Sequence, residues 1–184
     1  MGTIPLPKKK YKIIYADPPY YFKTYSKKGE SRSATKHYDC MGFDDICNMP
    51  VSNIVDLDCV LFMWVTDPFL EKAFKIINQW SFTYKTVAFT WVKGQQNQYL
   101  DYDFFKGMGY WTRGNPEMCL LATKGNPKRL SKNVEQFILS PRRKHSQKPD
   151  EIRDRIVQLC GDLPRIELFA RTRCKGWDSW GDEI

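Results

Sequence analysis

The sequence has little of what a metal site, a disulfide framework or a membrane span requires. It contains six cysteines, none in a Cys-x-x-Cys pair, and two histidines, His37 and His145, which lack cysteines at zinc-finger spacing. We therefore expect no bound metal and reduced cysteines packed as small apolar side chains. No apolar run approaches the roughly 20 residues that cross a bilayer, and the opening MGTIPLPKKK lacks an apolar signal core. We expect a soluble, intracellular protein with no membrane partner.

Acidic residues are also outnumbered, with 29 lysines and arginines against 21 aspartates and glutamates and a net charge of +8. The excess is concentrated in residues 23–36 and 124–148, and the second stretch has eight basic residues and one acid, Glu135. Either these are solvated loops, or they are arms that neutralise nucleic-acid phosphates and make binding depend on salt. Both stretches flank the motifs described below, which favours the second interpretation.

Hydrophobic patterning predicts the fold class. Short β-rich apolar runs bounded by turn residues predict buried strands at residues 11–16, 58–65, 83–93, 118–123 and 165–169. Helical spacing predicts helices over residues 67–79 and 149–160, the second ended by Gly161. Strands that alternate with helices predict a single α/β domain over residues 1–184, with a mostly parallel sheet and helices on both faces. Ligands of such sheets bind beyond the carboxyl ends of the strands.

A stiff acceptor-rich turn follows the first predicted strand: Asp17, Pro18, Pro19 and Tyr20. The prolines fix their own φ angles, hold the preceding residue extended and have no N–H to donate. The Asp17 carboxylate and a backbone carbonyl could therefore accept both hydrogens of a base's amino group and aim its lone pair at an electrophilic methyl group. Tyr20 could stack on the base, which in a duplex must first be flipped out. A purely structural Pro-Pro turn is the alternative, but the strand context favours a catalytic turn.

With this motif the chain resembles the MT-A70 family of adenine amino methyltransferases over about residues 11–183. Further blocks carry the resemblance in the same order: Leu61-Phe62-Met63-Trp64-Val65-Thr66, Thr90-Trp91-Val92-Lys93, Gly109-Tyr110-Trp111, Glu117-Met118-Cys119-Leu120, Lys124-Gly125-Asn126-Pro127, His145-Ser146-Gln147-Lys148-Pro149 and residues 165–183. The resemblance implies a Rossmann-like class I methyltransferase fold in permuted order, with the catalytic turn ahead of the cofactor-binding strand. It implies transfer of the methyl group of S-adenosylmethionine to the N6 amino group of adenine, which leaves S-adenosylhomocysteine, without a metal.

The cofactor site is expected near the carboxyl terminus. Lys148 stands just before a predicted helix start, so its ammonium and nearby N–H groups could hold the cofactor carboxylate, a role that the resemblance also implies. The resemblance assigns to the cofactor Asp17, Lys148, Phe169, Arg171, Arg173, Gly181, Asp182 and Glu183. Family members usually have Asn where Asp182 stands, and the carboxylate keeps an acceptor for a ribose diol. Glu167 is either structural or in direct contact.

The substrate is expected to be nucleic acid, and the resemblance favours DNA over RNA because the turn ends in tyrosine rather than in the tryptophan of the family's mRNA enzyme. Its candidate contacts are Tyr20, Tyr38, Lys93, Trp111, Glu117, Arg142 and Arg143. Tyr38 matches a family position near the acceptor pocket, although an ordinary loop tyrosine is an equal alternative. Sequence preference should be short or relaxed and should reside in residues 22–36 and 126–144, since few side chains are available to read base edges.

Two other functions stay open: an RNA adenosine-N6 methyltransferase and a non-catalytic nucleic-acid-binding partner subunit. A related amino methyltransferase acting on cytosine or on a protein glutamine is a further alternative. We expect a monomer or homodimer in the cytoplasm of a bacterial or phage-infected cell.

Overall fold

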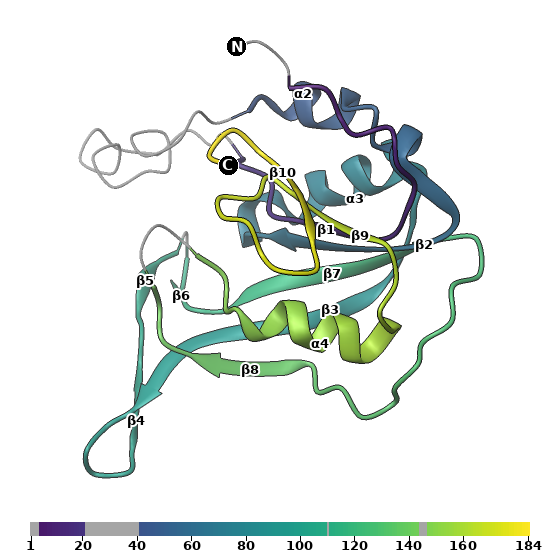
Figure 1. Ribbon diagram of the computed structural model, residues 1–184. Helices are drawn as coiled ribbons and strands as arrows, with labels where there is room; N and C mark the ends of the chain where they lie inside the picture. Colours follow the sequence, from purple (N-terminus) through teal and green to yellow (C-terminus); the bar gives the residue numbers. More distant parts are fainter. Residues whose placement is uncertain (1–3, 21–40, 110, 144–146) are drawn as a thin grey trace.

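The computed structural model describes residues 4–20, 41–109, 111–143 and 147–184 (Figure 1). The basic stretch 23–36 and Tyr38 lie outside these residues. The elements, in chain order, are β1 (Tyr11–Ala16), α2 (Phe43–Asn48), η2 (Val51–Ile54), β2 (Val55–Val65), η3 (Asp67–Phe69), α3 (Leu70–Gln79), β3 (Thr83–Gln96), β4 (Tyr102–Phe104), β5 (Gly107–Met108), β6 (Arg113–Gly114), β7 (Glu117–Lys124), β8 (Phe137–Ser140), α4 (Glu151–Cys160), β9 (Arg165–Leu168) and β10 (Asp178–Trp180).

The main sheet has the strand order β10-β9-β1-β2-β7-β3-β4, with β8 paired to β3. Strands β10, β9, β1 and β2 pair in parallel, as do β3 and β8. Strand β7 is antiparallel to both of its neighbours, β2 and β3, and β4 is antiparallel to β3. The expected α/β class is therefore confirmed, but the sheet is mixed, because β7 runs against the strands on either side of it.

This topology gives the sheet two distinct edges, one at each end of its strands. Strands β1, β2, β3, β8, β9 and β10 all end at one edge, called here the carboxyl edge. Strand β7 runs the other way and so begins at the carboxyl edge, where Trp91 of β3 is the partner of Glu117. Residues near the end of β3, the start of β7 and the ends of β1 and β9 are thereby gathered along one rim.

Helices cover both faces of the sheet (Figure 1). Strand β1 alternates, so that Ile14 and Ala16 belong to the core cluster with α2 and α3, and Ile13 and Tyr15 belong to the cluster with α4. On both faces the β1 side chains are almost entirely buried, apart from that of Lys12. Such burial of apolar area is the main stabilising contribution to a domain of this size. Because helices cover both faces of the sheet, a functional site is expected at the ends of the strands.

Several local predictions are confirmed. Strand β1 has the predicted bounds, and α4 ends at Cys160 before Gly161, whose φ is +93°. Cys59, Cys119 and Cys160 are free and buried, as expected of small apolar side chains. None of the helices in the described part of the chain is long and apolar enough to span a bilayer.

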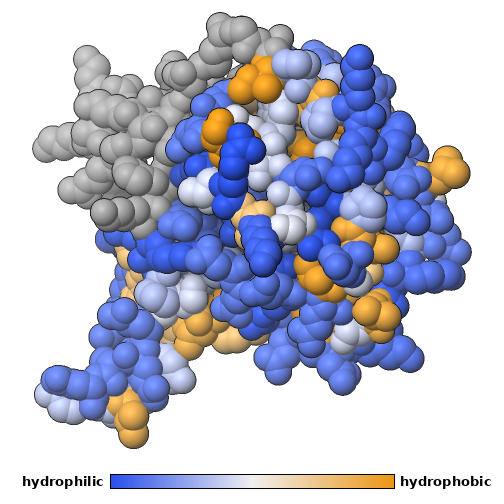
Figure 2. All heavy atoms as spheres, in the orientation of Figure 1, coloured by the Kyte–Doolittle hydropathy of each residue, from blue (hydrophilic) through white to orange (hydrophobic). Residues whose placement is uncertain are grey.

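The β3–β4 hairpin, by contrast, was predicted only as far as its first strand. It projects from the body in Figure 1, and Figure 2 shows apolar atoms at its tip, where Tyr99 and Leu100 are 80% and 77% exposed.

Candidate active site

The Asp17–Tyr20 turn leaves β1 at the carboxyl edge and is held by its last residue. The Tyr20 ring is buried, stacks on Phe69 with centroids 4.7 Å apart, and donates its hydroxyl to the Trp64 carbonyl at 3.2 Å. Burial raises the pKa of the Tyr20 hydroxyl, which therefore stays protonated. Phe69 covers one face of this ring, and the stacking of a base on Tyr20 stays a prediction.

The carbonyls of the two prolines are already engaged. Tyr20 N–H donates to the Pro18 carbonyl at 2.9 Å, and Met41 N–H donates to the Pro19 carbonyl at 3.1 Å. Each carbonyl oxygen keeps a second lone pair for another donor. The turn is thus rigid and rich in acceptors, and the hydrogen bond from Met41 ties it to the chain that follows residue 40.

A hollow of about 250 Å³ joins this turn to the tail of the chain. Its lining brings together Asp17, Pro19, Met41, Phe169, Ala170, Arg171, Trp180, Gly181, Asp182 and Glu183. Most residues assigned to the cofactor on sequence grounds therefore lie around one space, together with Asp17 and Pro19 of the turn. Arg173 is an exception, because it lines a second hollow with Lys9, Tyr11 and Trp177.

The backbone after β9 explains why the tail reaches the turn. Phe169 has a φ of +61°, which a non-glycine residue adopts only under strong local constraint. The next residue, Ala170, donates its N–H to the Trp180 carbonyl at 2.9 Å, and the Phe169 and Trp180 rings meet edge to face with centroids 5.6 Å apart. These contacts fold residues 178–183 back over the end of β9 and form the wall of the hollow.

Four charges of alternating sign form a chain beside the hollow. The Lys148 ammonium contacts both carboxylate oxygens of Asp17, at 2.9 and 2.8 Å, and a Glu117 oxygen at 3.3 Å. The other Glu117 oxygen accepts from the Lys93 ammonium at 2.6 Å. The side chains of Asp17, Lys148, Glu117 and Lys93 are only 25%, 9%, 11% and 13% exposed.

Each charge in this chain depends on its neighbours. Burial alone would lower the pKa of Lys148, but the Asp17 and Glu117 carboxylates outweigh it, so the pKa lies above its usual value. Burial alone would raise the pKa of Glu117, but Lys148 and Lys93 outweigh it, so the pKa lies below its usual value. Lys148 and Glu117 are therefore both charged near neutral pH. In this arrangement Lys148, expected at the cofactor carboxylate, lies on the carboxylate of the catalytic turn.

Of the other predicted substrate residues, Arg142 and Arg143 follow β8 at the carboxyl edge. The Arg142 guanidinium stacks on the Phe105 ring at 4.3 Å from its centroid and is exposed. Arg143 instead holds the start of α4, where it donates to Asp150 at 2.6 Å and to the Lys148 carbonyl at 2.7 Å. Trp111 is fully exposed. Tyr38 is not among the described residues, so its role stays a prediction.

Sequence reasoning missed several residues of the site. Met41 and Trp180 line the hollow, but Met41 meets the turn through a hydrogen bond to Pro19 and an isolated bridge to Tyr20, which leave no local sequence pattern. Glu167 proves to be paired, since Arg153 donates to its two oxygens at 2.7 and 2.8 Å. The helical spacing of α4 could have suggested that Arg153 faces β9. This pair supports a structural role for Glu167 and fixes α4 against the strand that leads into the hollow.

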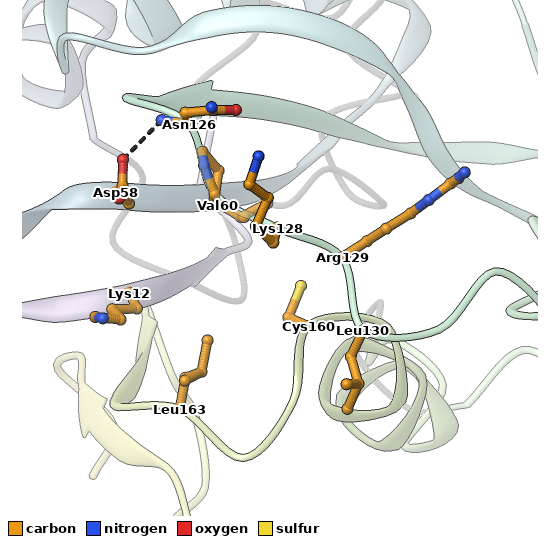
Figure 3. A pocket seen from close by; sticks show the side chains of 10 residues that line it. Lys12, Asp58, Val60, Asn126, Lys128, Arg129, Leu130, Cys160 and Leu163 are labelled. Carbon is orange, nitrogen blue, oxygen red and sulfur yellow. Dashed lines mark hydrogen bonds between the residues drawn. The ribbon is translucent and has the colours of Figure 1, made fainter.

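A third hollow, of about 360 Å³, lies at the opposite edge of the sheet (Figure 3). It is lined by Lys12, Lys128 and Arg129 above apolar side chains, while its acid, Asp58, accepts the Asn126 N–H at 2.7 Å. The basic stretch 124–148 is thus split between the two edges of the sheet. Across the described ranges, no group of three or more His, Cys, Asp or Glu side chains is placed to hold a metal ion.

Comparison with known proteins gives this geometry a family. The MT-A70 family model matches residues 11–183. A Mycoplasma type II methyltransferase, M.MunI, is 36% identical over 97% of this chain and 80% of its own length. The human N(6)-adenosine-methyltransferase catalytic subunit METTL3 is 28% identical over 95% of this chain, and an Arabidopsis thaliana MT-A70-like N(6)-adenosine-methyltransferase is 30% identical over 80% of it.

The matched region makes up only 28% of the length of the human protein and 21% of that of the Arabidopsis protein. Because the family model covers nearly the whole chain and M.MunI matches along most of both lengths, this chain belongs to the MT-A70 family of methyltransferases.

Proposed function

We propose that this protein transfers the methyl group of S-adenosylmethionine to the N6 amino group of adenine in DNA, with short or relaxed sequence preference. The observation that carries the proposal is the hollow in which Asp17 and Pro19 face Phe169, Arg171 and the last residues of the chain. We further propose that the domain is a Rossmann-like class I methyltransferase whose catalytic turn precedes its cofactor-binding strand.

The residues around the hollow suit the proposed cofactor. Asp182 and Glu183 offer carboxylate acceptors for the two hydroxyls of a ribose. Phe169 and Trp180 offer apolar surface, and Arg171 lies 3.7 Å from the Glu183 carboxylate, which it can orient. When bound, S-adenosylmethionine supplies an electrophilic methyl group on a sulfonium. The hollow brings this set within one space with Asp17, as a direct transfer between two bound molecules requires.

Asp17 and the proline carbonyls would act on the amino group. A carboxylate oxygen and the second lone pair of a proline carbonyl accept its two N–H groups, which turns the nitrogen lone pair toward the methyl group. The nitrogen–carbon bond then forms as the carbon–sulfur bond breaks, and the extra proton leaves through Asp17 to water. The rigid turn contributes mainly by positioning and by electrostatic stabilisation of the developing positive charge.

DNA is favoured as the substrate because M.MunI, which matches 97% of this chain, is named as a type II methyltransferase. The relatives named as N(6)-adenosine-methyltransferases support adenine as the base and keep an RNA substrate as the second candidate. Exposed Arg142, held on Phe105 after the end of β8, supports the proposal as a candidate phosphate contact.

The test is incubation of the purified protein with labelled S-adenosylmethionine and matched DNA, RNA and synthetic polymers that lack adenine. We expect label in adenine-containing DNA and, after digestion, in N6-methyladenine. Label that persists in adenine-free polymers would contradict the adenine assignment, and label confined to RNA would establish the second candidate.

Asp17→Ala should abolish methyl transfer and leave cofactor binding measurable, because most of the lining of the hollow is contributed by other residues. Calorimetric titration with S-adenosylhomocysteine would measure binding in parallel with the transfer assay. Full turnover by this variant would show that the chemistry takes place elsewhere.

A further inference from the structure

The chain of four charges contains a competition for one cation. Lys148 is the only one of the four side chains that contacts two carboxylates, those of Asp17 and Glu117. It lies on both oxygens of Asp17, at 2.9 and 2.8 Å, and farther from Glu117, at 3.3 Å. A buried carboxylate without a counter-ion is strongly unfavourable. The other partners of Glu117 therefore help to determine whether Lys148 pairs with Asp17 or with Glu117.

Lys93 is the neighbour that satisfies Glu117. Its ammonium lies 2.6 Å from a Glu117 oxygen, and it is held 5.2 Å from the centroid of the Trp91 ring and 6.0 Å from that of Phe105. It comes from β3, whereas Glu117 begins β7, and Trp91 and Glu117 are partners in the ladder between those strands. The sheet itself therefore fixes the Lys93–Glu117 pair, and Lys148 approaches from the loop that precedes α4.

We propose that Lys93 is a positioning residue for methyl transfer: by holding Glu117, it leaves Lys148 on Asp17 and so fixes the orientation of the catalytic carboxylate. The inference rests on the proposed function of Asp17. It reassigns Lys93 and Glu117, expected from sequence to contact the substrate, to a role exerted through Lys148. Both side chains are nearly buried and bonded to each other, which suits such a role.

The orientation of Asp17 matters because its carboxylate must accept a hydrogen in one direction. With the Lys148 ammonium bridging both oxygens, rotation of the carboxylate is restrained, while each oxygen keeps lone pairs for the substrate amino group. Removal of the Lys93 charge would leave Lys148 between two carboxylates, of which that of Glu117 is the more buried. The Lys148 ammonium would move toward Glu117, and the Asp17 carboxylate would then be free to rotate.

Three variants test this. Lys93→Met should lower kcat by about a hundredfold, because small misplacements of reacting groups have effects of that order. The KM values for cofactor and DNA should change little. Glu117→Gln should have a mild effect, since it removes the competing carboxylate, and the double variant Lys93→Met/Glu117→Gln should recover most of the lost kcat. Lys85→Met, on the exposed end of the same strand, is the matched control and should behave as the unmodified protein.

Direct contact of Lys93 and Glu117 with the substrate makes the opposite prediction. In that case each single variant would raise the KM for DNA, and the double variant would be at least as impaired as the worse single one. That pattern, or unchanged kcat in Lys93→Met, would overturn the proposal. If Lys93→Met does not fold, Lys93→Arg should keep most of kcat, and the double variant compared with Glu117→Gln alone still decides the question.

An independent measurement separates this inference from the proposed activity. The ε-carbon signal of Lys148 in the NMR spectrum, assigned by its loss in Lys148→Arg, should shift in Lys93→Met and return in the double variant. If the unmodified protein methylates no polymer, the proposed function fails, and this signal still reports whether Lys93 positions Lys148. A Lys148 signal indifferent to Lys93 would refute the positioning role even in an active enzyme.

Discussion

At the scale of single residues, Gly181 shows how closely the tail approaches the end of β9. A Cβ at this position would lie 2.3 Å from the Ala170 carbonyl oxygen and 2.8 Å from the Ala170 nitrogen, and backbone atoms cannot yield as a flexible side chain can. Gly181→Ala should therefore push Asp182 and Glu183 out of the hollow and weaken binding of S-adenosylhomocysteine by about tenfold or more. Titration calorimetry measures this, with Gly114→Ala as the control, because a Cβ there meets nothing within 4 Å.

Glu117 should also link stability to pH. Its pKa is lowered in the folded protein, so the charged carboxylate stabilises the fold above the unfolded pKa of about 4.3, and this contribution is lost as pH falls through the folded pKa. Glu117→Gln should thus be less stable than the unmodified protein at about pH 7, and the difference should shrink toward about pH 3. Urea unfolding of both proteins across this range is the measurement; a difference independent of pH would show that the carboxylate is not ionised in the fold.

The catalytic turn could be predicted from sequence because its properties are local. Proline geometry and the preceding strand are both contained within residues 11–20. The series of ion pairs from Asp17 through Lys148 and Glu117 to Lys93 could not be predicted from sequence, because each pairing depends on which strands become neighbours. In particular, the insertion of β7 between β2 and β3 brings Glu117 to the carboxyl edge, and no local pattern indicates that insertion.

At the scale of elements, the Arg153–Glu167 pair fixes α4 to β9. The two side chains are nearly buried and joined by two short hydrogen bonds, so Arg153→Met should leave Glu167 as an uncompensated buried carboxylate. We expect a loss of about 3–5 kcal/mol in the free energy of unfolding, measured in urea. Arg153→Met/Glu167→Gln should recover a large part of it. If the double variant were no more stable than the single one, packing of the arginine stem rather than charge would explain the loss.

The long elements and the four-residue strand β9 were predictable from sequence, and β8 and β10 were not. Strands β1, β2 and β3 and helix α4 carry enough apolar residues at a regular period to stand out, whereas β8 and β10 have four and three residues. Short strands gain most of their stability from tertiary partners, as β8 does by pairing with the end of β3. These unpredicted strands nevertheless place Arg142 after β8 and Trp180 on β10, so the least predictable elements contribute directly to the site.

At the scale of the whole molecule, the described basic residues of the stretch 124–148 lie at both edges of the sheet. Arg142 lies at the carboxyl edge near the catalytic turn, whereas Lys128 and Arg129 line the hollow at the opposite edge with Lys12 (Figure 3). Strand β1 separates the two edges by its six residues, at about 3.3 Å each. A nucleic acid held at the catalytic turn should therefore contact only the first group.

This division predicts how salt acts on binding. Affinity for a DNA duplex should fall steeply with salt, and Arg142→Met should reduce the slope of log affinity against log salt by about one, because one phosphate contact is lost. Lys128→Met/Arg129→Met should leave the slope unchanged, although it removes twice the charge. Fluorescence anisotropy between about 50 and 200 mM salt distinguishes these outcomes. A larger change in slope for the double variant would mean that the molecule binds DNA through its overall charge, and that the duplex reaches both edges of the sheet.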